Sequence, residues 1–110
     1  MVRSLKNLEI YEHSKKLVLA CYELTHNLPA EEKTNFAKYI RAAALSFHLN
    51  IAQGAFLKSK KRKKYFRKAK NALVIIDAAI EILIEVGFTT QKQVEKTLAI
   101  SSGCYKLINE

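Results

Sequence analysis

The chain has 110 residues, enough for one hydrophobic core, so we expect a single domain over residues 1–110. Hydrophobic residues make up 49% of it, with one proline and three glycines, which argues against a disordered chain and against a β-rich fold. The formal net charge is +9, and no uncharged apolar run has the length of a membrane span. The first residues also lack the apolar block of a secretory signal, and we therefore expect a cytoplasmic protein that does not enter membranes.

Two helices are predicted in the first half of the chain, over about residues 5–27 and 31–57, with Pro29 between them. Apolar residues of the first helix recur at helical spacing as one stripe: Ile10, Leu17, Cys21, Leu24 and Leu28. The inward-facing residues of the second follow the same spacing: Phe36, Ile40, Ala43, Phe47 and Ile51. Ser59 is expected to be the N-cap of the third helix.

The third and fourth helices are predicted over about residues 60–86 and 90–109. The third carries a heptad seam made of Phe66, Ala69, Leu73, Ile76, Ile80 and Leu83. Gly87 suits the position after its end, and Thr90 with Gln93 forms a capping box for the fourth helix. The stripe of the fourth helix is Val94, Leu98, Ser101, Tyr105 and Ile108. Long helices with short links predict an all-α, antiparallel up-down-up-down four-helix bundle.

The C-terminal half of the third helix has a narrow polar face. Within residues 72–86 only Asp77, Glu81 and Glu85 are polar, and they fall on one line. A surface helix of one bundle needs less apolar surface than this, so we expect a second contact with another copy of the chain. The predicted homo-oligomer interface consists of Leu73, Val74, Ile75, Ile82 and Ile84.

The N-terminal half of the same helix holds the excess charge of the protein. Residues 58–70 carry nine Lys or Arg and no acid, whereas the rest of the chain is balanced. Such a run predicts contact with the phosphates of RNA or DNA, with little sequence specificity because Lys predominates over Arg. Arg62 is expected to point away from this face, and Tyr65 is a candidate for base stacking. The predicted nucleic-acid-binding residues are Lys58, Lys60, Lys61, Lys63, Lys64, Arg67, Lys68 and Lys70.

Catalytic and metal-binding patterns are weak in this sequence. Glu23 and His26 have the spacing of a di-iron helix motif, but the chain has no second copy of it. No nucleophile stands beside a base, and no Gly-rich phosphate loop occurs. We therefore expect a protein that is not an enzyme and has no cofactor or metal. Cys21 and Cys104 are expected to be reduced thiols about 20 Å apart.

The stretch "IRAAALSFHLNIAQG", residues 40–54, contains Arg41, Ser46, Asn50 and Gly54 at the spacing of a known pattern. With "LTHNLPAEEK" at 24–33 and "EILIEVGF" at 81–88, it resembles a four-helix-bundle family with two branches. One branch comprises the proteins encoded by intervening sequences in bacterial 23S rRNA genes. The other comprises the accessory variability determinants (Avd) of diversity-generating retroelements. Gln53 and His48 depart from the usual residues of the pattern.

The resemblance implies a homopentameric barrel of four-helix protomers. For the retroelement branch it also implies binding of nucleic acid and of a reverse transcriptase through a basic surface. Our leading hypothesis is an oligomeric RNA- or DNA-binding accessory to a reverse transcriptase. The alternative is an intervening-sequence-type scaffold that binds an acidic protein or the acidic line of a neighbouring copy. A basic helix lying on anionic lipid is a weaker third possibility. Ser46 and Asn50 are expected to satisfy buried hydrogen bonds rather than to contact a ligand.

Overall fold

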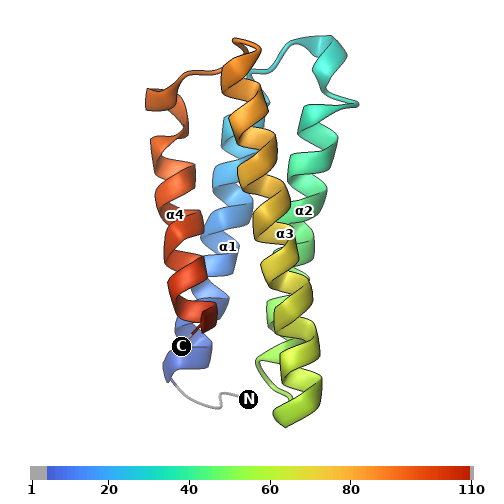
Figure 1. The fold of residues 1–110 in the computed structure, drawn as a ribbon, viewed down its shortest axis with the longest axis vertical. Coiled ribbons are helices and arrows are strands. Elements are labelled where there is room, and N and C mark those ends of the chain that lie inside the picture. The colour runs from blue at the N-terminus through green and yellow to red at the C-terminus, as the bar shows by residue number, and fades with distance from the viewer. Residues whose placement is uncertain (1–4, 110) are drawn as a thin grey trace.

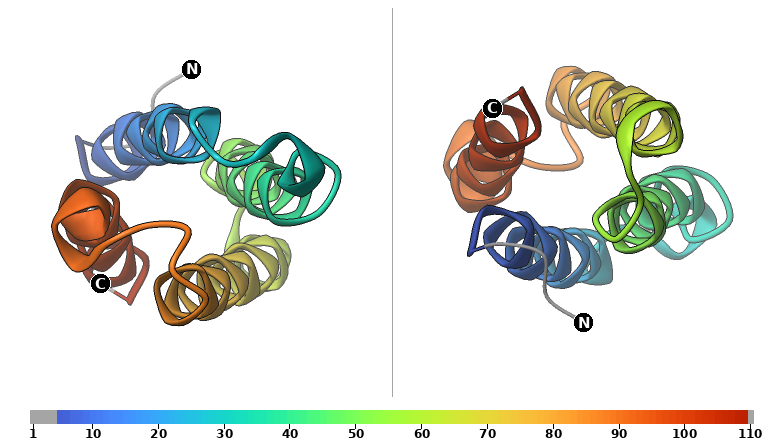
Figure 2. Two further views of the ribbon diagram at one scale, coloured as in Figure 1. Left: turned by 90° about the horizontal axis from the view of Figure 1, so that it is seen from above. Right: turned by 90° about the horizontal axis from the view of Figure 1, so that it is seen from below.

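The computed structural model describes residues 5–109, in which four α-helices and one short 3-10 helix are the only regular elements (Figure 1). They are α1 (Leu5–His26), η1 (Ala30–Glu32), α2 (Phe36–Gly54), α3 (Ser59–Glu85) and α4 (Gln91–Asn109). Seen from either end, the four α-helices form a ring in chain order (Figure 2). The predicted all-α, antiparallel four-helix bundle is therefore confirmed within these residues.

The core lies along the centre of this ring. The predicted seam of α3 is buried from Ala69 to Leu83, and Phe66 is partly buried at its basic end. Phe47 of α2 is the largest fully buried side chain. On α4 the buried line is shifted slightly from the prediction, because Thr97 and Cys104 are buried whereas Leu98 and Tyr105 are only partly so.

The link between α3 and α4 has the predicted capping chemistry. Gly87 has φ +86°, and its N–H donates to the carbonyl of Ile84 at 3.0 Å while Phe88 N–H donates to Leu83 at 3.0 Å. These two bonds form a Schellman motif, which glycine allows without strain. The capping box is also present: Gln93 N–H donates to Thr90 Oγ1 at 3.2 Å, and Thr90 N–H donates to Gln93 Oε1 at 3.1 Å.

The start of α2 and the start of α3 differ from the prediction. Pro29 leads into η1, where Glu32 N–H donates to the Pro29 carbonyl at 2.8 Å, and the α-helix begins only after Asn35. Asn35 has a non-helical backbone, so it separates the short helix from α2. Ser59 is not the N-cap of α3: it lies in the first turn with φ +48°, and Lys58 is the cap residue without a side-chain cap bond.

Buried polar side chains connect α1 to α2. Thr25 Oγ1 donates to the carbonyl of Cys21 at 2.7 Å and accepts from Arg41 Nε at 2.8 Å. Ser14 Oγ donates to the Tyr11 carbonyl at 2.6 Å and lies 2.8 Å from His48 Nδ1. Burial and, to a lesser degree, Lys15 lower the pKa of His48. These bonds hold the register between the two helices, since a shift would leave buried polar groups unpaired.

The motif residues of α2 have structural roles, but one prediction about them was wrong. Asn50 Nδ2 donates to the Ser46 carbonyl at 2.8 Å and to Ser46 Oγ at 3.2 Å, and this pair lies at the surface rather than in the core. Gly54 is buried because Phe66 packs against it: a Cβ at this position would lie 2.7 Å from Phe66 Cδ1. Gly54 thus sets how closely the turn after α2 approaches α3.

The two cysteines are buried free thiols. They are closer than the predicted distance of about 20 Å, because Cys104 Sγ lies 3.8 Å from the carbonyl of His13, roughly two turns along α1 from Cys21. Burial, then Asp77, then Cys104 raise the pKa of Cys21 to about 12. Burial also raises the pKa of Cys104 to about 12. Both thiols are therefore protonated at neutral pH and poor nucleophiles.

Candidate nucleic-acid interface

The basic segment, residues 58–70, occupies the cap residue and the first turns of α3. This end of α3 extends beyond the end of α4 (Figure 1). The predicted binding residue Lys70 is half-buried, and the other seven are exposed: Lys58, Lys60, Lys61, Lys63, Lys64, Arg67 and Lys68. The structure therefore brings all eight predicted residues to one end of the bundle.

No described acidic side chain neutralises the basic segment. Among the described side chains, the ion pairs are Lys15–Glu12 at 3.3 Å and Lys96–Glu23 at 3.4 Å, and neither includes a residue of the segment. The first turn of α3 also lacks an acidic residue and a side-chain cap, so its free backbone N–H groups add to the positive potential. The end of the bundle formed by the basic segment thus combines side-chain cations with the positive end of a helix dipole.

On the side facing α2, the lysines surround an aromatic ring. The ammonium groups of Lys68 and Lys64 lie 5.4 and 5.9 Å from the centre of the Tyr65 ring. With Gln53 and Leu57, this ring lines a shallow hollow of about 420 Å³. Tyr65 is half-exposed, so a nucleic-acid base could reach its ring as predicted. In the unbound protein the ammonium groups of the two lysines lie beside that ring.

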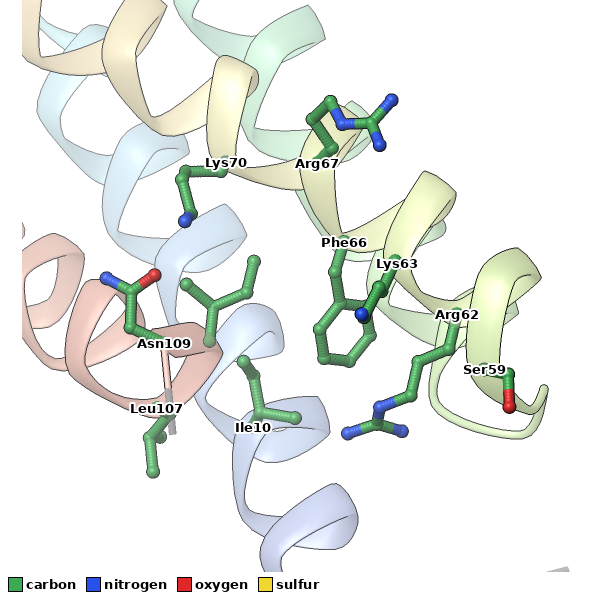
Figure 3. Close-up of a pocket in the computed structure, with 10 residues that line it drawn as sticks. Ile10, Ser59, Arg62, Lys63, Phe66, Arg67, Lys70, Leu107 and Asn109 are labelled. Carbon is green, nitrogen blue, oxygen red and sulfur yellow. The ribbon is translucent and has the colours of Figure 1, made fainter.

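On the side facing α1 and α4, the segment lines a larger pocket of about 590 Å³ (Figure 3). Its cationic wall is formed by Arg62, Lys63, Arg67 and Lys70 of α3. Its apolar wall is formed by Ile10 of α1, Phe66 of α3 and Leu107 and Ile108 of α4. The prediction did not include this pocket, because the divergence of α3 from α4 at this end is a property of the folded bundle.

Arg62 is the one basic residue of the segment with a structural role. Its Nη2 donates to Asn7 Oδ1 at 2.7 Å, and Asn7 Nδ2 donates to the carbonyl of Ala55 at 3.0 Å. The guanidinium also lies over the Phe66 ring, 4.4 Å from its centre. As predicted, Arg62 points away from the exposed basic face. It fastens the first turn of α3 to α1 and to the turn after α2, and thereby fixes the position of the lysines around it.

The predicted oligomer residues divide between core and surface. Leu73 is 0% exposed, so its side chain lies inside the protomer and cannot contact a neighbour. Ile84 is partly buried against the core. Val74, Ile75 and Ile82 are 54%, 52% and 47% exposed, as an interface with another copy would require. Leu73 belongs to the heptad seam, which faces the protomer core, and its inclusion in the interface was wrong.

The acidic line of α3 is also shorter than predicted. Glu81 and Glu85 are exposed, but Asp77 is half-buried and accepts a hydrogen bond from Ser101 Oγ at 3.0 Å. Burial raises the pKa of Asp77, and the bond from Ser101 opposes this in part. Asp77 therefore belongs to the contact between α3 and α4 rather than to the surface.

The residues with metal-binding spacing do not converge. Glu23 pairs with Lys96, and His26 is exposed at the end of α1. Within the part of the chain that the structure describes, no three His, Cys, Asp or Glu side chains are grouped closely enough to hold a metal ion. None of the helices described combines the length and apolar composition that crossing a bilayer requires.

The family model of the 23S rRNA-intervening sequence protein matches residues 6–110, nearly the whole chain. No curated protein matches the chain. The family match, together with the four-helix bundle, confirms one branch of the resemblance that the motif of α2 carries. The chain belongs to the 23S rRNA-intervening sequence protein family.

Proposed function

We propose that this protein is a non-enzymatic, oligomeric RNA- or DNA-binding protein whose basic segment contacts phosphates. The observation that carries the proposal is the set of seven exposed cations at one end of the bundle, which form no ion pair with an acid among the described residues. Each phosphate that such a cation neutralises releases a condensed counterion, which favours binding. Phosphate contact of this kind needs little sequence information, so binding depends on charge and shape.

The arrangement of charge in α3 supports this function because it does not stabilise the helix. Cations stand at the N-terminus and exposed acids, Glu81 and Glu85, at the C-terminal end. This order opposes the helix dipole by ~0.3–1 kcal/mol for each charge in the first or last turn. Like charges spaced three or four residues apart in the basic segment add ~0.2–0.5 kcal/mol per pair. A polyanion bound at the basic end offsets the repulsion between the cations and their unfavourable interaction with the N-terminal end of the helix dipole.

Oligomer formation is supported by the exposed apolar side chains of the other half of α3. Val74, Ile75, Ile82 and Val86 are each about half exposed, and the last three share one face of the helix by their spacing. Burying this face against another copy would repeat the basic end around a ring. The five-membered ring that the resemblance implies is tested by native mass spectrometry, where a monomer would reject the oligomer.

The rival function is a scaffold that binds acidic proteins or the acidic line of a neighbouring copy. Asp77 was the third acid of that line, and its place in the contact with α4 leaves only Glu81 and Glu85 to pair with lysines of another protomer. The shortened line therefore weakens the pairing between copies, and the comparison of polynucleotides with acidic proteins as ligands separates the remaining form of the rival from our proposal.

We propose, more specifically, that the protein partner is a reverse transcriptase. This part of the proposal rests only on the resemblance to the retroelement branch and on the positive charge of the chain. It predicts that the protein copurifies with a reverse transcriptase encoded beside it. If the neighbouring genes encode no such enzyme, the nucleic-acid-binding function stands without this partner.

The main test compares two triple charge reversals. Lys60→Glu, Lys64→Glu and Arg67→Glu change three exposed cations of the basic segment. The control, Lys16→Glu, Lys38→Glu and Lys92→Glu, makes the same change in net charge at exposed positions elsewhere. In a filter-binding titration with single-stranded RNA or DNA, we expect the first variant to lose binding and the control to retain most of it. Equal binding by the two variants would reject the site.

A further inference from the structure

The pocket beside the basic segment is concave and has an apolar wall, and contact with phosphates alone would require neither feature. Its volume of about 590 Å³ lies in the range of small-molecule sites, ~300–1,000 Å³. It lies where α3 diverges from α4, and residues of α1, α3 and α4 contribute to its walls (Figures 1 and 3). A flat run of lysines would be sufficient for a phosphate backbone, whereas a concave site can enclose a group.

The two kinds of wall suit the two parts of a nucleotide. Lys63 and Lys70 extend their ammonium groups toward the hollow, whereas Arg67 turns outward (Figure 3). None of the described lining residues is acidic, so a phosphate would meet only positive charge there. Ile10 and Ile108 also line the pocket and offer an apolar surface to a base.

The Arg62–Phe66 pair adds a planar surface beside these residues. The guanidinium is held over the ring at 4.4 Å, and its bond to Asn7 at 2.7 Å fixes its plane before any ligand arrives. Arginine planes and aromatic rings are the surfaces on which proteins stack unpaired bases. A prearranged surface loses less conformational entropy on binding than a mobile one.

We propose that this pocket receives one unpaired nucleotide of a bound strand, either a terminal or an extruded one. Lys63 and Lys70 hold its phosphate, and its base lies against Ile10, Ile108 and the Arg62–Phe66 pair. The outward cations, such as Arg67, hold the neighbouring phosphates of the same strand. This inference rests on the proposed nucleic-acid binding and adds to it a preference for strands with accessible bases.

The test compares two pairs of substitutions that remove the same charge. The pocket pair is Lys63→Met with Lys70→Met, and the control pair is Lys61→Met with Lys68→Met, on residues that do not line the pocket. The probes are a short single-stranded oligouridylate and inorganic polyphosphate, which has the charge but no bases. On oligouridylate we expect the pocket pair to weaken binding about tenfold more than the control, equivalent to ~1.4 kcal/mol and within the range of one base stack. On polyphosphate the two pairs should lose affinity equally.

A second measurement observes the apolar wall directly. In methyl NMR spectra of the unmodified protein, oligouridylate should shift the resonances of Ile10, Leu107 and Ile108, and polyphosphate should leave them in place. Equal losses for the two pairs on oligouridylate, or unmoved methyl groups, would overturn the pocket proposal while the basic segment remained a polyanion site. Failure of the unmodified protein to bind either probe would instead overturn the proposed function, and this inference with it.

Discussion

The two halves of α3 differ in their surroundings: the C-terminal half packs in the core, and the N-terminal half carries exposed cations. Residues 72–85 pack their seam into the core and end in the Schellman motif at Gly87. Residues 59–70 begin without a side-chain cap, extend beyond the end of α4 and carry cations that pair with none of the described acids. The comparison indicates that the C-terminal half stabilises the protomer. The N-terminal half presents a charged surface, and the contacts of Arg62 hold it in place.

The largest effect that this comparison predicts is on the core of the C-terminal half. Leu73→Ala removes a fully buried side chain, and we expect the free energy of unfolding to fall by about 2–5 kcal/mol. Its neighbour Val74 is half exposed, so Val74→Ala should leave the protomer within about 0.5 kcal/mol of the original and should weaken the oligomer instead. Chemical denaturation and native mass spectrometry measure the two effects. Similar losses of protomer stability for both variants would contradict the division between core and interface.

A smaller effect on stability distinguishes the structural residue Arg62 from the exposed cations of the basic segment. Arg62→Met removes the bonds to Asn7 and Ala55, and we expect it to lower stability by about 1.5 kcal/mol. Lys61→Met removes the same charge from an exposed position and should change stability by no more than about 0.5 kcal/mol. Thermal unfolding in the absence of nucleic acid makes the comparison. If Lys61→Met proved as destabilising as Arg62→Met, then Arg62 would not be the residue that fixes this end of α3.

The smallest effect concerns Asp77 in the C-terminal half. Because burial raises its pKa, the folded protein binds this proton more tightly than the unfolded chain, and stability falls as the pH rises from the ordinary value of 3.8. Asp77→Asn keeps an acceptor for Ser101 without the buried charge. We expect it to raise stability at pH 7 by about 0.5 kcal/mol or less, and to give no gain below pH 3.8. A lower melting temperature of this variant at pH 7 would contradict the cause given for the shift.

The sequence predicted the parts of the fold that depend on local chemistry. The seam of α3, the capping box at Thr90 and the glycine at position 87 each need only a short pattern, and the structure confirms them. The polar residues Ser14 and Thr25 in the core were not predicted, because their partners on α2 are distant in the sequence. Their positions on the apolar stripe of α1, among residues that must be buried, were the signal that could have identified them.

The candidate site was predicted in composition but not in shape. Charge density alone indicated the basic segment, since charge can be counted along the chain. The pocket depends on how far α3 extends past α4 and on how the helices diverge, which is set by packing between distant residues. Asp77 was misplaced for a related reason, because it lies near the border between the core face and the exposed face of α3, where helical periodicity is least decisive. Leu73 already belonged to the predicted seam, and that pattern alone assigns it to the core.

The salt dependence of polynucleotide binding tests the central claim most directly. If the seven exposed cations of the basic segment each contact a phosphate of a single strand, the logarithm of the binding constant should fall against the logarithm of salt concentration with a slope of about −5. The triple charge reversal in the segment should abolish both the binding and the slope, whereas the control reversal elsewhere should preserve the slope. Binding that does not change with salt, or no binding in dilute buffer, would contradict the account.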